Sequence, residues 1–264
     1  MTTPSTMPAA YIPHGGGPAF FLHDGMADMF RPMGEFLAGF NALLPAKPSA
    51  ILIITAHWEE PVVTVTGGTN PALIYDYYGF PKETYALTYP APGSPELAAK
   101  VAGLLRQAQI AVEVDPAHGW DHGVFIPLKV MYPQADIAVV AMSLKTGLDP
   151  QAHVAIGKAL RPLRDEGVLI VGSGMSYHNL RQLGNGPAAA QFDHWLDGAL
   201  HGDAAHRQAQ LAQWSSAPAG RLSHPREEHL LPLMVASGAG SDAVGRKLWD
   251  GLVGPTAVAA WAFD

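Results

Sequence analysis

Ala50-Ile-Leu-Ile-Ile-Thr55 is the stretch of sequence that decides the fold. It is a short apolar run without the alternation of polar and apolar residues that marks a half-exposed strand. Such a run is typical of a strand that is buried on both faces, which occurs in α/β proteins where helices cover the sheet on both sides. The run therefore predicts a central strand with other strands on either side of it.

Further strand-like runs lie on both sides of helix-like stretches. Pro61–Thr66 follows the central run so closely that we expect the two to pair. The chain ends with another apolar run, which could be the last strand. The additional strand-like runs cover residues 110–114, 137–141, 167–171 and 257–263.

Capping residues predict where helices begin. Ser94-Pro95-Glu96 and Asp149-Pro150 each combine an N-cap residue with a proline at the first helical position. The expected helices cover residues 26–44, 95–109, 150–166 and 187–213. Strands alternating with helices predict an α/β fold with a largely parallel or mixed sheet, and the absence of repeats and linkers predicts one domain over residues 1–264.

Composition excludes several classes of protein. The chain has 264 residues, of which 48% are apolar and 15% are charged, so it can bury a large core and is not a disordered protein. A net charge of −7 and the lack of a Lys/Arg run argue against a nucleic-acid partner. Because there is no cysteine, disulfides, thiolate metal sites and a cysteine nucleophile are excluded.

The sequence also bears on localisation. Met1–Ala10 has no charged region followed by a long apolar region, so it does not have the pattern of a signal peptide. The apolar runs, such as Ala50–Ile54, are far too short to span a membrane. We therefore expect a soluble, cytoplasmic protein without a membrane partner.

Histidines are the candidate functional residues. Five of the twelve are expected on polar helix faces, exposed to solvent: His23, His153, His194, His201 and His206. The other seven lie in loops or at strand ends: His14, His57, His118, His122, His178, His224 and His229. Ligands in open α/β sheets bind beyond the carboxyl ends of strands, and neutral imidazole binds Fe, Zn, Cu and Ni.

A metal site can be assembled from these positions. His14 and His57, each at the end of an expected strand, could supply two ligands, and the stretch Glu227-Glu228-His229 could supply a third. For any single histidine the alternative is a loop residue that binds only backbone. The glycines after His14 have two interpretations of their own. One is a tight turn with positive φ, and the other is a loop similar to the HGGG oxyanion hole of esterases, which would need a G-x-S-x-G motif that the chain lacks.

Seven short motifs, in order along nearly the whole chain, resemble those of the class III extradiol ring-cleavage dioxygenases, the LigB-type superfamily, and in particular its DOPA-dioxygenase-like branch. They are Pro13-His-Gly-Gly-Gly-Pro18, Ala56-His-Trp58, Tyr75-Asp-Tyr-Tyr-Gly-Phe-Pro81, Tyr89-Pro-Ala-Pro-Gly93, Trp120-Asp-His-Gly123, Tyr177-His-Asn-Leu180 and His224-Pro-Arg-Glu-Glu-His-Leu-Leu-Pro232.

The resemblance implies a single three-layer α/β domain that binds one divalent metal, Fe(II) for activity, with Zn(II) as a plausible bound ion. It implies His14, His57 and His229 as metal ligands, with Glu228 as the fallback for the third. It also implies His178 as the catalytic acid–base residue and His122 as a second catalytic histidine. The substrates would be a small aromatic catechol and O₂, and the product a muconic semialdehyde.

Elementary chemistry agrees with these roles. Catechol oxygens bound to a metal lose their protons more easily, and a neutral histidine can accept a proton near neutral pH. The aromatic residues of Tyr75–Pro81 could line the substrate ring or belong to the core. Arg226 and Lys82 could pair with a substrate carboxylate or be ordinary surface charges.

Two other functions fit the same residues. A protein on the same scaffold could act by binding alone, since a fold does not guarantee its chemistry. Three histidines with an open position also suit a catalytic zinc ion, and hence a hydrolase. Neither the particular catechol nor the oligomeric state follows from the sequence.

Overall fold

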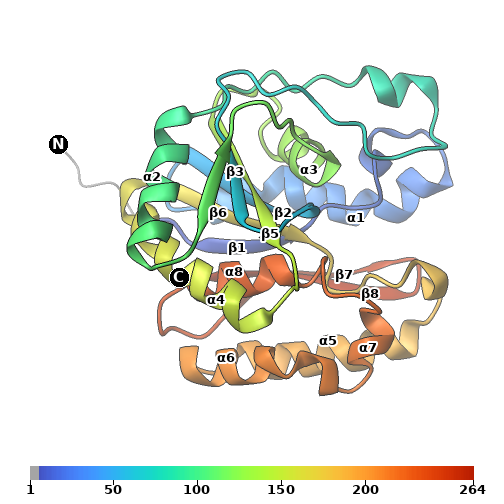
Figure 1. Ribbon diagram of the computed structural model, residues 1–264. Coiled ribbons are helices and arrows are strands. Elements are labelled where there is room, and N and C mark those ends of the chain that lie inside the picture. The colour runs from blue at the N-terminus through green and yellow to red at the C-terminus, as the bar shows by residue number, and fades with distance from the viewer. Residues whose placement is uncertain (1–5) are drawn as a thin grey trace.

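The computed structural model describes residues 6–264, whose strands form one eight-stranded mixed sheet in the order β4-β3-β5-β2-β6-β1-β8-β7 (Figure 1). Pairing is parallel between β1 and β6, β6 and β2, β2 and β5, and β3 and β4, and antiparallel elsewhere. The predicted α/β class with a mixed sheet is confirmed. The strands are β1 (Ala9–Pro13), β2 (Ala50–Glu60), β3 (Val63–Thr66), β4 (Val112–Asp115), β5 (Ala138–Lys145), β6 (Val168–Gly174), β7 (Arg246–Val253) and β8 (Thr256–Phe263).

Strand β2 is central, as predicted from its apolar run. Its residues from Ile51 to Ile54 are fully buried and point alternately to the two faces of the sheet. Leu52 and Ile54 belong to one hydrophobic core, while Ile51 and Ile53 belong to the other. Two cores on opposite faces explain why the run contains no polar residue.

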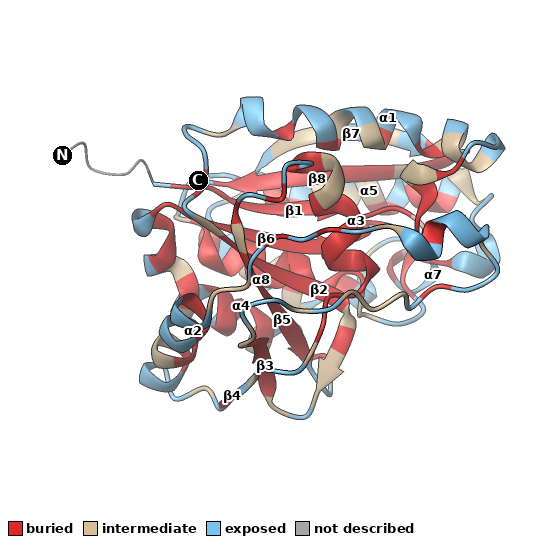
Figure 2. Ribbon diagram, turned by 90° about the horizontal axis from the view of Figure 1, so that it is seen from above, coloured by how far each residue is buried: buried red, intermediate tan, exposed pale blue. Residues whose placement is uncertain are grey.

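Helices cover both faces of the sheet, so that the molecule has three layers (Figure 1). Helices α1 and α3 pack on one face, while α2, α4, α5, α6 and α8 pack on the other. Figure 2 shows buried strands between helices whose outer sides are exposed. The helices are α1 (Gly25–Gly39), α2 (Pro95–Gln107), α3 (His122–Met131), α4 (Pro150–Leu160), α5 (Gly186–Leu200), α6 (Ala204–Ala212), α7 (Gly220–Ser223) and α8 (Leu231–Ala239).

The predicted helix starts at Ser94 and Asp149 are confirmed. The Ser94 hydroxyl accepts a hydrogen bond from the backbone N–H of Leu97, and the Asp149 carboxylate accepts from Gln151 and Ala152. The predicted helix over 187–213 is wrong in one respect, because it is divided into α5 and α6. Asp203 caps the second helix by accepting from the backbone N–H of His206, which restarts the helix after a break.

The predicted pairing of 61–66 with the central run is also wrong. Both edges of β2 are occupied, by β5 and by β6, so β3 crosses to the outer side of β5 and pairs with β4 and β5. His57 does not follow the end of a strand either. It lies within β2, where the pairing with β5 shifts between Ile54 and Glu59 and leaves an irregular segment.

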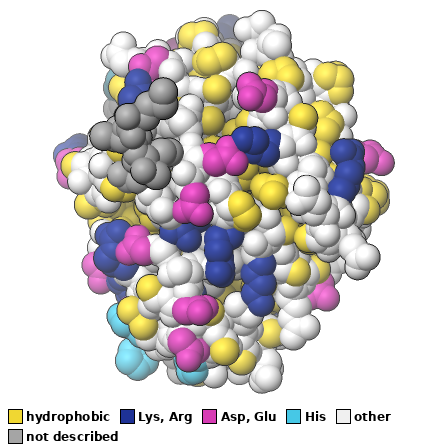
Figure 3. Space-filling model, turned by 90° about the vertical axis from the view of Figure 1, so that its left-hand side faces the viewer, with side chains coloured by type: hydrophobic (Ala, Val, Ile, Leu, Met, Phe, Trp, Pro, Cys, Tyr) yellow, Lys and Arg dark blue, Asp and Glu magenta, His cyan; other side chains and the backbone are white. Residues whose placement is uncertain are grey.

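The surface and the helices give two observations on partners. Lysines and arginines lie among aspartates and glutamates on the face shown in Figure 3, without a patch of a single sign there. Among residues 6–264, no helix combines the length and the apolar character needed to cross a bilayer.

Candidate metal centre

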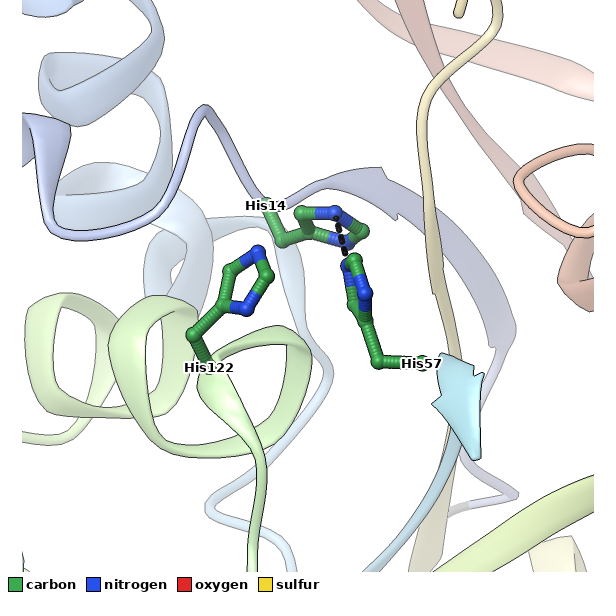
Figure 4. Close-up of side chains that lie close together, drawn as sticks. All are labelled: His14, His57 and His122. Carbon is green, nitrogen blue, oxygen red and sulfur yellow. Dashed lines mark hydrogen bonds between the residues drawn. The ribbon is translucent and has the colours of Figure 1, made fainter. Parts of the chain in front are cut away.

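Five histidines meet at the carboxyl ends of the parallel strands. His14 follows β1, His57 lies in β2, His122 begins α3, His178 follows β6, and His229 precedes α8. The ring centroids of His14, His57 and His229 lie 4.8–5.2 Å apart, and that of His178 lies 3.3 Å from that of His229. Figure 4 shows the rings of His14, His57 and His122 turned toward one another. All five histidines named as site residues from the sequence are thus brought together.

The turn after β1 directs His14 into this cluster. Gly15 and Gly17 have φ of 84° and 55°, in the left-handed region that glycine adopts without strain. The predicted tight turn with positive φ is confirmed. It lets the chain reverse directly after the His14 side chain, which is fully buried beneath it.

Ser173 fixes which nitrogen of His14 carries the proton. The Ser173 hydroxyl donates to the backbone carbonyl of Gly123, so at its 3.0 Å contact with Nδ1 of His14 it acts as the acceptor. Nδ1 of His14 therefore carries the proton and Nε2 carries a lone pair. Ser173 was not found from the sequence, because a serine at the end of an apolar strand has no distinguishing pattern.

The Nε2 atoms of His14 and His57 face each other. They are 3.1 Å apart, while Nδ1 of His57 lies 3.7 Å from the Asp76 carboxylate. The 3.7 Å contact is too long for a hydrogen bond, so without a metal ion Nε2 of His57 can donate to the lone pair on Nε2 of His14, along the dashed line in Figure 4. A metal ion would displace this proton and bind both nitrogens. Two nitrogens at about 2.1 Å from one ion are about 3.0 Å apart at a right angle and about 3.4 Å apart at a tetrahedral angle. The donor set fits one metal ion.

The pKa values of the three histidines are low, so their rings are neutral and can bind a metal ion. Burial, reinforced by the neighbouring histidines, lowers the pKa of His14 and of His57 well below the usual value. Burial also lowers the pKa of His229, to about 4, although Glu228 acts in the opposite direction. Imidazoles must be neutral to bind metal, so the site remains competent below neutral pH.

Two histidines compete for the place of the third ligand. The ligand nitrogens of His14, His57 and His122 lie within 4.8 Å of one another. His229 also lies beside both His14 and His57, at centroid distances of 5.2 Å and 4.8 Å. Its Nδ1 is 3.1 Å from the Glu228 carboxylate, which leaves Nε2 free.

Glu228 contacts two of the histidines, His229 and His178. Its Oε1 contacts Nδ1 of His229 at 3.1 Å and Nδ1 of His178 at 3.4 Å. Burial raises the pKa of the Glu228 carboxyl, but hydrogen bonds from these two rings lower it more, and the resulting pKa lies well below the usual range. The charged carboxylate can therefore orient both rings, which lie parallel with a 17° angle between their planes.

Asp76 has the same role toward His122. Its Oδ1 accepts from the backbone N–H of His122 at 2.9 Å and lies 2.8 Å from Nδ1 of the same residue. Its Oδ2 faces His57. In the sequence, Asp76 stands out only as part of an aromatic motif. Its position between two tyrosines, Tyr75 and Tyr77, was the available signal.

The five histidines line a cavity of about 500 Å³. The remaining wall is mostly apolar and comes from α1, the loop that contains Phe80, the segment after β6 and the β7–β8 hairpin. Of the aromatic residues between Tyr75 and Pro81, Phe80 lines the cavity. Tyr75 and Tyr77 instead donate their hydroxyls to the carbonyls of Leu87 and Thr84, which stabilises the loop.

The other candidate residues lie outside the cavity lining. His118 stacks on Trp58, with ring centroids 3.7 Å apart, and His224 is buried beside Phe192 and Trp214. Lys82 is exposed, and Arg226 forms ion pairs with Glu59 and Glu228.

The prediction that His153 is a solvated surface residue is wrong. Its side chain is buried, and its Nε2 accepts a hydrogen bond from the backbone N–H of Lys145. The backbone carbonyl of Asp149, one turn earlier in the chain, lies 2.7 Å from the opposite nitrogen, Nδ1. A histidine that satisfies two backbone groups in this way can be buried at low cost.

Replacing Ser173 with alanine should weaken metal binding by about 10- to 100-fold, because His14 loses the partner that fixes its tautomer. Competition with a chelator of known affinity measures the change. Ser143→Ala is the matched control, because Ser143 is a buried serine that accepts from the backbone of Thr64, away from the site. Equal affinities of the two variants would contradict the assigned role of Ser173.

His224 should make stability depend on pH. Its Nε2 donates to the carbonyl of Ser176 at 3.0 Å, and burial lowers its pKa to about 3. Below an unfolded-state pKa of about 6.5 only the unfolded chain takes up this proton, so the free energy of unfolding falls as the pH falls from there toward 3. In His224→Phe the slope measured by urea unfolding of the metal-free protein should decrease by about 1.4 kcal/mol per pH unit. An unchanged slope would mean that His224 is protonated in the folded state.

Comparisons with known proteins agree with this geometry. Residues 6–260 match the model of a family described as the catalytic LigB subunit of aromatic ring-opening dioxygenase. The chain is 41% identical to the 4,5-DOPA dioxygenase extradiol of Beta vulgaris, over 88% of this chain and 91% of that protein. It is 39% identical to the dioxygenase tasH of Hapsidospora irregularis, over 88% and 78%.

A solved structure is similar over its whole length. An uncharacterized protein from Escherichia coli K12 superposes with a TM-score of 0.79 at 31% identity, covering 98% of this chain and 100% of that one. The two proteins therefore share the whole fold and are also related in sequence.

Proposed function

Because the chain belongs to the family of the catalytic LigB subunit of aromatic ring-opening dioxygenases, we propose that it opens a catechol ring with O₂ beside the two hydroxyl groups. The chain is a ring-cleaving dioxygenase, and relatives at 34–41% identity are named 4,5-DOPA dioxygenase extradiol. The observation that carries the proposal is the pair of Nε2 atoms, 3.1 Å apart, that faces an otherwise apolar cavity.

His14, His57 and His229 are the proposed metal ligands. Imidazole rings bound to one ion at right or tetrahedral angles have centroids about 4.6–5.3 Å apart, and the three rings lie 4.8–5.2 Å apart. The ring of His122 fits less well, because its centroid is only 4.0 Å from that of His57. Glu228 is not needed as the fallback ligand, since its carboxylate is occupied by two rings.

Fe(II) is the proposed metal. Ring opening with O₂ needs a metal that takes part in redox chemistry, which Fe(II) does and Zn(II) does not. When bound, Fe(II) supplies open positions for both catechol oxygens and for dioxygen, and lowers the pKa of the catechol hydroxyls.

His178 and His122 are the proposed acid–base residues. Both line the cavity, and in each ring Nδ1 faces a carboxylate, Glu228 or Asp76. The carboxylates therefore leave Nε2 of each ring to face the substrate. Nε2 of His178 accepts the proton of a catechol hydroxyl and later returns it, while Nε2 of His122 accepts hydrogen bonds on the side of dioxygen and substrate.

Oxygen uptake tests the proposed function. The metal-free protein is loaded with Fe(II) or with Zn(II), and consumption of O₂ is measured with a panel of catechols. With Fe(II) we expect one O₂ consumed per ring opened and both atoms of ¹⁸O₂ in the product, whereas the Zn(II) form should consume none. Absence of uptake by the Fe(II) form across the panel would overturn the proposal and favour a binding protein.

A further inference from the structure

The cavity that contains the histidine cluster is lined without a charged side chain other than histidine. Among the described residues, its lining includes no aspartate, glutamate, lysine or arginine. Its wall is built mainly from apolar residues on four separate segments of the chain. They are Met26, Met29 and Phe30 of α1, Phe80, Leu180 and Leu183 after β6, and Val253, Pro255 and Val258 of the β7–β8 hairpin.

The two hydroxyl groups in this lining are already used. The Tyr177 hydroxyl donates to the carbonyl of Gln182 at 2.8 Å, and the Thr256 hydroxyl donates to the carbonyl of Leu183. Both bonds hold the cavity wall together. Gly15–Gly17, which follow His14 directly in the chain, also line the cavity.

Positive charges lie close by, but not in this cavity. Arg181 and Arg226 line a surface groove that shares His178 and Leu180 with the cavity, and Arg226 is paired with Glu59 and Glu228. The carboxylates nearest the histidines, Asp76 and Glu228, face ring nitrogens and have no donor to offer a substrate carboxylate.

We propose that the substrates of this enzyme are catechols with an uncharged, apolar substituent, and that catechols with a charged side chain are poor substrates. This inference rests on the proposed function. A substituent with a carboxylate or an ammonium group would lose its hydration in the cavity without finding a partner, which is costly. An apolar substituent would instead gain about 25 cal/mol for each Å² removed from water.

The size and composition of the cavity agree with such a substituent. Its volume lies in the range of about 300–1,000 Å³ that is typical of sites for drug-sized ligands, so it has room beyond one catechol ring. Three of its lining residues are methionines, Met26, Met29 and Met175, whose flexible side chains adapt to different apolar shapes. Leu180 and Leu183, which are 67% and 46% exposed, extend the apolar wall to the solvent.

A matched pair of substrates tests the proposal. 4-Propylcatechol and 3-(3,4-dihydroxyphenyl)propionate have side chains of equal length that end in a methyl group or a carboxylate. With the Fe(II)-loaded enzyme, kcat/KM should be at least about tenfold higher for the propyl compound, and L-DOPA should resemble the carboxylate. Equal or higher kcat/KM for the carboxylate would overturn the proposal.

A charge placed in the wall should reverse the preference. Met29→Lys introduces an ammonium group at a half-buried lining position and should shift the ratio of the two kcat/KM values by at least about tenfold toward the carboxylate. Ala38→Lys is the matched control, because it adds the same charge on an exposed part of α1 that does not line this cavity. A ratio that moves equally in both variants would contradict the assignment of the cavity.

Binding to the Zn(II)-loaded protein separates this proposal from the proposed function. Calorimetry should give a dissociation constant at least about tenfold lower for 4-propylcatechol than for the carboxylate, whether or not a ring is opened. If this preference holds but Fe(II) protein opens no ring, the proposed function fails alone. If catechol is opened but the carboxylate binds and reacts better, the substrate class fails alone.

Discussion

Replacing His14 with alanine is expected to abolish both metal binding and ring opening. Removing a residue that merely orients a ligand weakens metal affinity by about 10- to 100-fold, so loss of a buried ligand should exceed that range. His14 is fully buried, and its Nε2 faces that of His57 at 3.1 Å. The variant is loaded with Fe(II) and dialysed, and its metal content and O₂ uptake are then measured. Both quantities should fall to background.

The same measurements identify the third ligand. His229→Ala should also lose the metal, whereas His122→Ala should retain it and lose activity only. His118→Ala is a control, because His118 stacks on Trp58 and is not part of the cavity lining. Retention of metal by His229→Ala together with its loss in His122→Ala would move the third ligand to His122, which the nitrogen positions also allow.

Strong periodic or apolar patterns predicted most of the fold. The run Ala50–Thr55 indicated the centre of the sheet, and the caps at Ser94 and Asp149 indicated two helix starts. Helix α3 could not be predicted in this way because it contains Gly123 and Pro127, which are both unfavourable inside a helix. Helix α8 contains Pro232 and Gly238, and its residues are buried all round, so it has no amphipathic pattern.

The candidate site was predicted at the level of the residues that can bind metal or move protons. All five histidines came from motifs, and the structure brings them together. Of the residues that orient them, Ser173 and Asp76 act through contacts between distant parts of the chain, whereas Glu228 is the neighbour of His229 and was named from the sequence only as a fallback ligand. His14 and Ser173 are 159 positions apart, and His122 and Asp76 are 46 apart, so spacing carried no information about these pairs.

Burial was the property that the sequence predicted least well. His153 lies on a helix among residues that looked polar, yet it is buried because two backbone groups use both of its ring nitrogens. His224 lies in a motif of the family, but its ring is part of an aromatic cluster instead of the metal site. Whether a histidine binds metal or backbone depends on which groups surround it, and these come from other elements of the fold.

Replacing His178 with alanine is expected to lower kcat by about 10²- to 10⁴-fold while the protein keeps its metal. Its ring stacks on that of His229 at a centroid distance of 3.3 Å, and Nδ1 faces Glu228 at 3.4 Å. Without this ring the contact between His229 and Glu228 remains, so the metal ligand stays oriented. Metal content, the dissociation constant for catechol and single-turnover rates separate the loss of proton transfer from a loss of binding.

Added imidazole provides the decisive readout for His178. The alanine variant leaves a space of one imidazole ring beside His229, at the edge of the cavity. If His178 transfers protons, free imidazole should restore part of the activity of His178→Ala, and the restored rate should increase with the concentration of neutral imidazole. His14→Ala should show no such recovery while it lacks metal. A His178→Ala enzyme that turns over normally, or one that loses its metal, would show that His178 is not the acid–base residue, because a proton-transfer group is required for the reaction but not for metal binding.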